Sequence, residues 1–229
     1  MNFRSDHVYI LFGKSNSGKT HLAGYIANNL PSVAIFETLL KRTTYRNIAN
    51  LKNTFNVKDI SLCDVTNDAK QKPFYPKIRF YPRDLDNETI DSFCTELLKR
   101  RDTLGIFEET QMIFPNRKNP SKTQTMLLRA GGHDWAVGQV YMTQRISDCN
   151  KLTHAQYNHA FFFKCTLSND LDYIEENWGS TVRNEIPKLR HQINNNPQDH
   201  EFVYCNDQDY AAVCYLDGNQ IKTVRMLSQ

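Results

Sequence analysis

Short apolar runs recur along the chain, and each is bounded by residues that are typical of turns. The first run, HVYILF at 7–12, has no polar residue after its histidine, as expected of a strand that is buried on both faces of a sheet. The same pattern predicts further strands at 32–37, 77–81, 103–108, 138–143 and 159–165. Strands buried on both faces are typical of parallel sheets, which need helices on either side.

Helical patterns separate these strands. A helix is predicted to begin near Thr20, because apolar residues then recur at helical spacing until Pro31 ends it. A second helix can be capped by Asp86 or Asn87. It ends in the basic residues 99–101, which suit the negative end of the helix dipole.

Two further regions complete the pattern. Ser121 and Gln124 form a capping box for a short helix through Leu128, which we expect the glycine pair at 131–132 to close. The region from 168 to about 190 is acidic and helical. The C-terminus is predicted to be a hairpin, 211–216 with 220–226, turning at 217–218.

Strands that alternate with helices imply right-handed crossovers and an α/β fold with a mainly parallel sheet and helices on both faces. No internal repeat, low-complexity tract or linker is visible in the 229 residues. We therefore expect a single domain over 1–229, with a core at about 7–190 and a C-terminal extension at about 200–229.

Composition and charge exclude several classes of protein. The hydrophobic fraction of 40% and the charged fraction of 23% are those of a globular protein, which excludes wholesale disorder. The formal net charge of +3 is too small to identify a nucleic-acid binder. The six cysteines form no C-x-x-C pair, and no signal peptide or long apolar run is present. These features exclude a secreted disulfide scaffold and an integral membrane protein, and favour reduced thiols in a cytosol-type compartment.

Residues 13–20 match the phosphate-binding pattern G-x-x-x-x-G-K-[ST] between a buried strand and a helix. The two glycines let successive backbone N–H groups turn toward phosphate oxygens, and the helix adds its positive end. The lysine would reach the β- and γ-phosphates, and the threonine hydroxyl would bind Mg²⁺. The predicted nucleotide-binding residues are Gly13, Lys14, Ser15, Asn16, Ser17, Gly18, Lys19 and Thr20.

Three polar residues at strand ends are candidates for catalysis. Glu108 and Glu109 follow the strand LGIF, at the carboxyl edge where α/β sheets bind ligands. We assign Glu108 to the Mg²⁺ ion, through a water molecule, and Glu109 to the attacking water. Gln144 ends the next strand, where it could contact the γ-phosphate or the attacking water.

Together these blocks resemble the FtsK–HerA superfamily of P-loop motor ATPases. The discriminating block is Arg129-Ala-Gly-Gly, which leads through the strand at 138–143 into Thr143-Gln144-Arg145. The resemblance covers residues 7 to 180 and is strongest to the genome-packaging ATPases of tailless, membrane-containing double-stranded DNA viruses. It implies a RecA-like (ASCE) P-loop core in which the strand before Gln144 lies between the strands that carry the P-loop and the acidic pair. Such proteins usually have Asp where Glu108 stands, and the longer side chain of glutamate would shift the geometry of the metal site.

Clustered basic residues indicate where DNA would bind. Residues 111–130 contain Arg117, Lys118, Lys122 and Arg129 and no acid; residues 41–60 are also net basic, whereas 166–186 hold five acids and one Arg. This asymmetry predicts one positive and one negative surface. We expect Arg117, Lys118 and Lys122, in the loop 116–122, to contact the DNA backbone without reading its sequence. A ring motor also needs an arginine from a neighbouring subunit; Arg129 is preferred to Arg145 for this role.

The resemblance thus implies an ATP-hydrolysing DNA translocase, with ATP and Mg²⁺ as cofactors and double-stranded DNA as partner. It would act as a ring, a homohexamer, at a capsid or portal vertex, with no membrane span of its own, in the cytoplasm of an infected cell or at the packaging vertex of a virion. Three alternatives remain open. A small-molecule or nucleotide kinase would use Lys19 and Thr20 in the same way, and a Zot-like phage assembly or export ATPase would normally carry a membrane span. A regulatory GTPase is disfavoured because 150–153 reads N-K-L-T and lacks the Asp of the guanine-reading motif.

Overall fold

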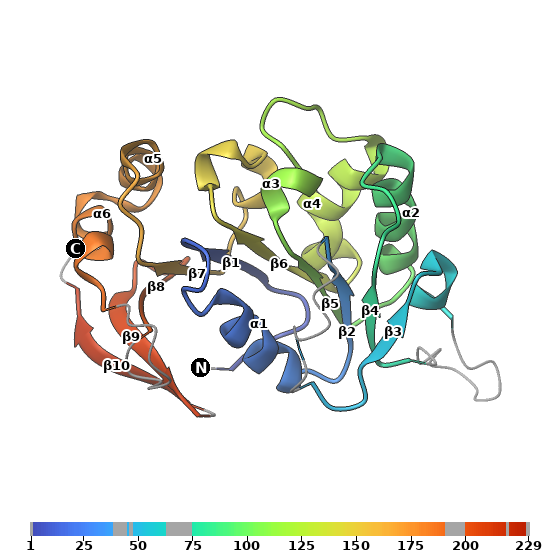
Figure 1. Ribbon diagram of the computed structural model, residues 1–229, viewed down its shortest axis with the longest axis horizontal. Helices are drawn as coiled ribbons and strands as arrows, with labels where there is room; N and C mark the ends of the chain where they lie inside the picture. The colour runs from blue at the N-terminus through green and yellow to red at the C-terminus, as the bar shows by residue number, and fades with distance from the viewer. Residues whose placement is uncertain are drawn as a thin grey trace.

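The computed structural model of the chain describes residues 2–38, 45, 48–62, 75–190, 200–218 and 220–227. Within these residues the strands form one ten-stranded sheet, in the order β10-β9-β8-β7-β1-β6-β5-β2-β4-β3 (Figure 1). The neighbouring pairs from β7 to β3 are parallel, and β8, β9 and β10 continue the sheet in antiparallel fashion from β7. The α/β fold with a mainly parallel sheet is therefore confirmed, as is the C-terminal hairpin.

All the predicted strands are present, with small shifts at their ends. β3 and β8 were not predicted: β3 is short and polar, and β8 was missed although the turn residues at 194–199 precede its apolar run. The parallel strands are β1 (Val8–Phe12), β2 (Val33–Phe36), β3 (Lys52–Thr54), β4 (Lys77–Phe80), β5 (Thr103–Phe107), β6 (Val137–Thr143) and β7 (His159–Phe163). The antiparallel strands are β8 (Glu201–Asn206), β9 (Ala211–Asp217) and β10 (Gln220–Met226).

Helices cover the two faces of the sheet unequally. One face packs against α1 through Leu22, Ala23 and Ile26, whereas α2 and α4 cover the opposite face over β2, β4 and β5 (Figure 1). On that opposite face α5 and α6 cover β7, β8 and β9. The helices are α1 (Lys19–Asn28), α2 (Asn87–Leu98), α3 (Thr110–Ile113), α4 (Lys122–Asp134), α5 (Ser168–Trp178) and α6 (Ser180–Glu185), with 3₁₀ turns η1 (Val57–Ile60), η2 (Ile146–Asp148), η3 (Lys151–Thr153) and η4 (Ile186–Lys188).

The expected end of α4 is wrong. Ser121 does cap the helix and forms the capping box with Gln124, but the helix runs through Gly131 and Gly132 to Asp134. The reason is close packing, since a Cβ atom at Gly132 would overlap the carbonyl oxygen of Asp6. Gly132 therefore lets α4 approach the chain that enters β1, and Gly131 lets the helix approach β6, where a Cβ atom would overlap the Gln139 side chain and the Val137 carbonyl.

The strand order has one direct consequence for function. β6, which precedes Gln144, lies between β1, which leads into the P-loop, and β5, which leads into Glu108. The arrangement implied by the resemblance is thus confirmed. Because all three strands are parallel, their carboxyl ends bring these residues to the same edge of the sheet. No helix among the described residues is both long and apolar enough to cross a membrane.

Candidate nucleotide-binding site

The predicted P-loop borders a cavity of about 370 Å³ at the carboxyl edge of the sheet. Residues 15 to 20 form one wall of the cavity, and Glu108, Glu109, Met142 and Gln144 line it from β5 and β6. Asn16 and Gly18 have positive φ angles of 59° and 101°, which curl the loop before α1 begins. Gly13 N–H donates to the Thr143 carbonyl over 3.2 Å and ties the loop to β6. The residues predicted from three separate segments therefore share one cavity.

Lys19 is buried beneath this loop. Its Nζ donates to the carbonyl oxygens of Gly13 and Lys14 over 2.6 and 2.8 Å. Burial lowers the pKa of Lys19 to about 8, although the nearby Glu109 and Glu108 oppose this shift. Phosphate oxygens in the cavity would stabilise the ammonium form, so this lysine is suited to an anionic ligand.

The carboxylate of Glu108 faces the cavity in a buried, acidic setting. Burial raises the pKa of Glu108 to about 7, and the charge of Glu37 raises it further, while a hydrogen bond from Tyr45 opposes the change. Glu37 follows β2, the neighbour of β5, and pairs with Arg79 over 3.2 Å. Glu37 was not predicted, because its position beside Glu108 follows only from the order of the strands.

The cavity offers two oxygen donors of the kind that Mg²⁺ prefers. Thr20 and Glu108 offer a hydroxyl and a carboxylate at the same cavity. No group of three His, Cys, Asp or Glu side chains that could hold a metal occurs in the described part of the chain. Mg²⁺ is commonly bound by one or two protein oxygens together with phosphate oxygens and water, so these residues fit that ion. A cation beside Glu108 would also lower the raised pKa of its carboxyl group, because it would stabilise the charged form.

Glu109 is held by two amide side chains. Gln144 Nε2 donates to Glu109 Oε1 over 2.8 Å, and Gln111 Nε2 donates to Glu109 Oε2 over 2.6 Å. The side-chain oxygen Oε1 of Gln111 in turn accepts a hydrogen bond of 2.6 Å from the Thr143 hydroxyl. This bond links the segment after β5 to the end of β6. Glu109 itself has a left-handed backbone, with φ 50° and ψ 52°. Gln111 was not predicted, since it lies two residues beyond the acidic pair in the short helix α3.

Two histidines also line the cavity. His21 follows Thr20 in α1, and His200 directly precedes β8. A Cβ atom at Gly18 would lie 3.4 Å from His200 Cβ, so His200 packs against the P-loop. The sequence offered no signal for His200, because it reaches the site only through the pairing of β8 with β7.

The predicted DNA-binding residues lie on an exposed loop that leads away from the acidic pair. Arg117, Lys118 and Lys122 are exposed, and the segment between α3 and α4 projects from the top of the view in Figure 1. The loop backbone is anchored, because Asn116 N–H donates to the Asp148 carbonyl over 2.7 Å and Asn150 N–H to the Phe114 carbonyl over 2.8 Å. The start of the loop, which follows β5, is therefore hydrogen-bonded to the segment that follows β6.

Arg129 lies far from this cavity. It is exposed on α4 beside a second hollow of about 270 Å³, which Asp6 and His7 also line. These residues precede β1, so Arg129 is at the amino edge of the parallel strands, opposite the P-loop. It could reach a nucleotide only in a neighbouring subunit. Arg145, the alternative, pairs with the buried carboxylate of Asp170 over 3.0 Å.

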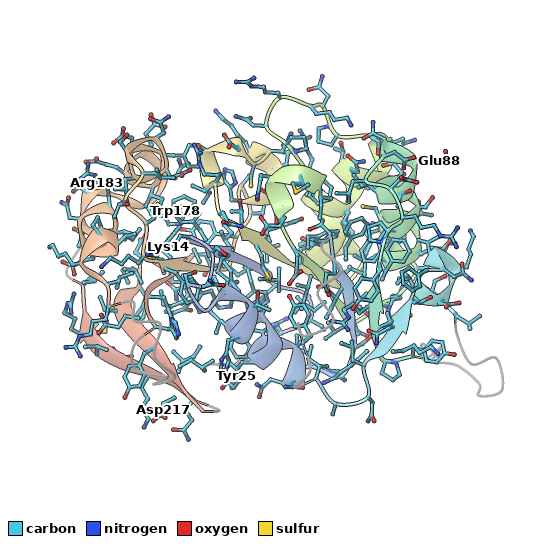
Figure 2. All side chains as sticks on the ribbon, in the orientation of Figure 1. Lys14, Tyr25, Glu88, Trp178, Arg183 and Asp217 are labelled. Carbon is cyan, nitrogen blue, oxygen red and sulfur yellow. The ribbon has the colours of Figure 1, made fainter. Side chains whose placement is uncertain are left out.

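The acidic segment 166–186 is largely neutralised within the fold. Asp170 is buried against Arg145. Arg183, which is labelled in Figure 2, lies within 4.0 Å of Asp172 and 3.5 Å of Glu175. Glu185 pairs with Lys188 over 2.9 Å. The strongly negative surface that the sequence predicted is thus reduced to a few exposed carboxylates.

The basic segment 41–60 is described only in part. Lys41, Arg42 and Arg46 lie outside the described residues. Lys52 lies over the Tyr75 ring at 5.3 Å, and Lys58 pairs with Glu96 over 3.0 Å. The described cations of this segment therefore have local partners.

Comparison with known proteins agrees with this geometry. No family model matches the sequence, and no curated protein matches it. Several solved structures are similar to this chain. One is the genome packaging NTPase B204 from Sulfolobus turreted icosahedral virus 2 in complex with sulfate, which has a TM-score of 0.73 and 16% sequence identity and covers 92% of this chain and 96% of that chain. Its complex with AMPPCP gives a TM-score of 0.73 and 16% identity over 91% and 97%. A third structure is that of B204, the DNA-packaging ATPase from Sulfolobus turreted icosahedral virus. It has a TM-score of 0.68 and 17% sequence identity, over 93% of this chain and 98% of that chain. The chain therefore has the P-loop NTPase fold of these packaging proteins.

Proposed function

We propose that the protein is an ATPase that moves double-stranded DNA, as the genome-packaging motor of a virus, and that it acts as a ring. The observation that carries the proposal is the cavity in which Lys19, the Glu108–Glu109 pair and Gln144 meet from three adjacent parallel strands. The similarity to the B204 packaging NTPase over nearly the whole chain supports the same interpretation. The 229 residues would act as one domain, because β8–β10 continue the sheet of the core.

ATP binding would use the P-loop. Lys19 would exchange the carbonyl oxygens of Gly13 and Lys14 for β- and γ-phosphate oxygens, and backbone N–H groups of the loop would hold the other phosphate oxygens. Thr20 and Glu108 would hold Mg²⁺, which supplies charge neutralisation on the phosphates when bound.

Hydrolysis would use Glu109 and Gln144. A water oxygen attacks the γ-phosphorus, the bond from this phosphorus to the bridging oxygen of ADP breaks, and the proton of the water passes to the Glu109 carboxylate. Gln144 and Gln111 fix the two oxygens of that carboxylate, so its direction is set before the water arrives. The same chemistry serves a kinase, in which the acceptor is another hydroxyl.

DNA would be held by Arg117, Lys118 and Lys122. The loop that carries them begins only a few residues beyond Glu109, so a movement of α3 during hydrolysis would be passed to the DNA contacts. We place the protein at the packaging vertex in the infected cell, where a capsid or portal protein would be its further partner.

The test is ATP hydrolysis by the purified protein with and without double-stranded DNA of mixed sequence. Hydrolysis should rise with DNA, and this rise should fall steeply with salt because counterions are released on binding. Lys19→Ala should abolish hydrolysis. Glu109→Gln should retain ATP but not hydrolyse it; if Glu108→Gln alone gives this phenotype, the two carboxylate roles are reversed.

A charge-matched pair of triple variants separates DNA contact from general charge. Arg117→Ala with Lys118→Ala and Lys122→Ala should keep basal hydrolysis and lose the stimulation by DNA. Lys99→Ala with Lys188→Ala and Lys222→Ala removes three exposed cations elsewhere and should keep the stimulation. Phosphoryl transfer to a small-molecule acceptor, with no response to DNA, would instead establish the kinase alternative.

A further inference from the structure

The order of the strands sets the direction in which a nucleotide can lie on the P-loop. β6 and β5 lie on one side of β1, and β7 and β8 lie on the other. The groups suited to the γ-phosphate, Glu109 and Gln144, follow β5 and β6. A triphosphate with its γ end toward those groups must therefore extend its nucleoside toward β7 and β8.

His200 stands at that end of the cavity. β8 is antiparallel to β7, with Phe202 opposite Phe163, so the start of β8 lies at the carboxyl edge of the parallel strands. This register brings His200 to the P-loop, where its Cβ would be 3.4 Å from a Cβ at Gly18. His21 reaches the same cavity from the first turn of α1.

An apolar hollow lies behind the two histidines. His21, His200 and Gly18 line both the main cavity and a second hollow of about 30 Å³, whose other walls are Leu22, Phe163, Phe202 and Leu216. Phe163 and Phe202 are 2% and 1% exposed, so they form the apolar wall of this hollow and are not themselves open to a base. The nucleoside end of the cavity therefore combines two imidazole rings, the exposed His21 and the half-buried His200, with an apolar floor.

We propose that His200 and His21 form the nucleobase subsite of the protein, and that it selects purine nucleotides by stacking. The proposal rests on the proposed nucleotide binding. Stacking on aromatic rings tolerates any base, but the wider π-face of a purine gains more contact than a pyrimidine does. Backbone contacts at the P-loop read only phosphates, so the histidines supply the selection of the base.

The experiment compares the binding of ATP, GTP, CTP and inorganic tripolyphosphate by titration calorimetry at pH 8 with Mg²⁺. The wild-type protein should bind ATP and GTP more tightly than CTP and tripolyphosphate. His200→Ala should weaken ATP binding about tenfold, the size of base–aromatic stacking measured by alanine substitution, and leave tripolyphosphate binding unchanged. His200→Phe should retain ATP binding, because a phenyl ring also stacks.

A control variant shows whether the loss of any histidine would have the same effect. His133→Ala removes a histidine that is 93% exposed on α4 at the opposite edge of the sheet, and it should bind all four ligands as the wild type does. His21→Ala should act as His200→Ala does, to a smaller extent. Equal wild-type affinity for ATP and tripolyphosphate, or equal losses of both in His200→Ala, would overturn the subsite and leave the P-loop intact. A wild-type protein that binds neither ligand would overturn the proposed function and the subsite together.

Discussion

The pKa values of Lys19 and Glu108 are both shifted toward the neutral forms of these side chains, because both are buried beside the same cavity. Burial lowers the pKa of Lys19 to about 8 and raises the pKa of Glu108 to about 7. Shifts of this kind cluster at functional sites, where a ligand restores the charged forms. A phosphate beside Lys19 and a cation beside Glu108 would do so, which links the binding of nucleotide to that of the metal.

The protonation of Glu108 predicts a stability effect that depends on pH. The folded protein binds this proton more tightly than the unfolded chain does. The protonated Glu108 therefore contributes to the free energy of unfolding in full below about pH 4.5, and this contribution is lost as the pH rises through about 7. Glu108→Gln removes that titration. The free energy of unfolding of the variant, relative to wild type, should therefore rise by about 2–3 kcal/mol between pH 5 and pH 8, at 1.36 kcal/mol per pKa unit. Urea unfolding at these pH values measures it, and the exposed Glu176→Gln should show no such trend.

Gln111 is expected to position Glu109 for catalysis. Gln111→Ala removes the donor to Glu109 Oε2 and the acceptor for Thr143, and a hydrogen bond to a charged group contributes about 1.5–3 kcal/mol. We expect kcat for ATP to fall at least about tenfold and KM to stay within about twofold. Gln111→Glu should be worse still, since it places a second carboxylate beside the first.

The control for this variant is its neighbour on α3. Met112 is 50% exposed, so Met112→Ala should hydrolyse ATP at the wild-type rate. Wild-type kcat in Gln111→Ala would mean that Gln144 alone orients Glu109.

Sequence patterns could predict the side chains at strand ends but not their cross-strand partners. Glu108, Glu109 and Gln144 follow apolar runs directly, so a strand prediction places them at the edge of the sheet. Glu37 follows an apolar run in the same way and His200 directly precedes β8, yet they come beside the site only when β2 pairs with β5 and β8 pairs with β7. Those pairings depend on contacts distant in sequence, which a local pattern does not contain.

Helix α4 illustrates how tertiary packing overrides a local signal. Glycine is among the weakest helix formers, so the pair at 131–132 predicts an end. The helix continues because Gly132 packs closely against the chain before β1 and Gly131 packs closely against β6. The capping box at Ser121 was predicted correctly because it depends only on the helix itself.

Gly132→Ala distinguishes these two effects by sign. Helix propensity alone would stabilise the protein by about 1 kcal/mol, whereas overlap with the Asp6 carbonyl is expected to cost about 1–3 kcal/mol, as overpacking does. A net loss in the free energy of unfolding is expected, because backbone atoms cannot rotate away as a side chain can. His133→Ala, on the exposed face of the same helix, should not reproduce the loss. A more stable Gly132→Ala protein would mean that the entry to β1 yields easily.

The two ends of the parallel sheet carry different chemistry. The carboxyl edge holds the P-loop, the acidic pair and the basic loop, whereas Arg129 lies at the amino edge. Overall composition could not predict this separation, because the charge blocks along the sequence are partly cancelled in the fold, as Asp170 is by Arg145 and Glu185 is by Arg225. The separation means that no single subunit can supply Arg129 to its own nucleotide.

Mixing of two inactive variants therefore tests whether neighbouring subunits share a site. In a ring, Arg129→Ala should reduce turnover about 10³-fold or more and leave nucleotide affinity largely intact, since the arginine acts on charge that develops during hydrolysis. When Arg129→Ala subunits are mixed equally with Lys19→Ala subunits, about a quarter of the interfaces pair an intact Lys19 with an intact Arg129, because each of two independent choices is met half the time. Hydrolysis should recover to about that fraction of the wild-type rate. The control is a mixture of Lys19→Ala and Glu109→Gln subunits. Each active site takes its P-loop and its carboxylate from the same subunit, so no interface in this mixture has a complete site. Its rate of hydrolysis should therefore stay below that of the Arg129→Ala and Lys19→Ala mixture. A mixed ring of Arg129→Ala and Lys19→Ala with no recovery would exclude Arg129 from the shared site, and Arg145 would be the next arginine to replace.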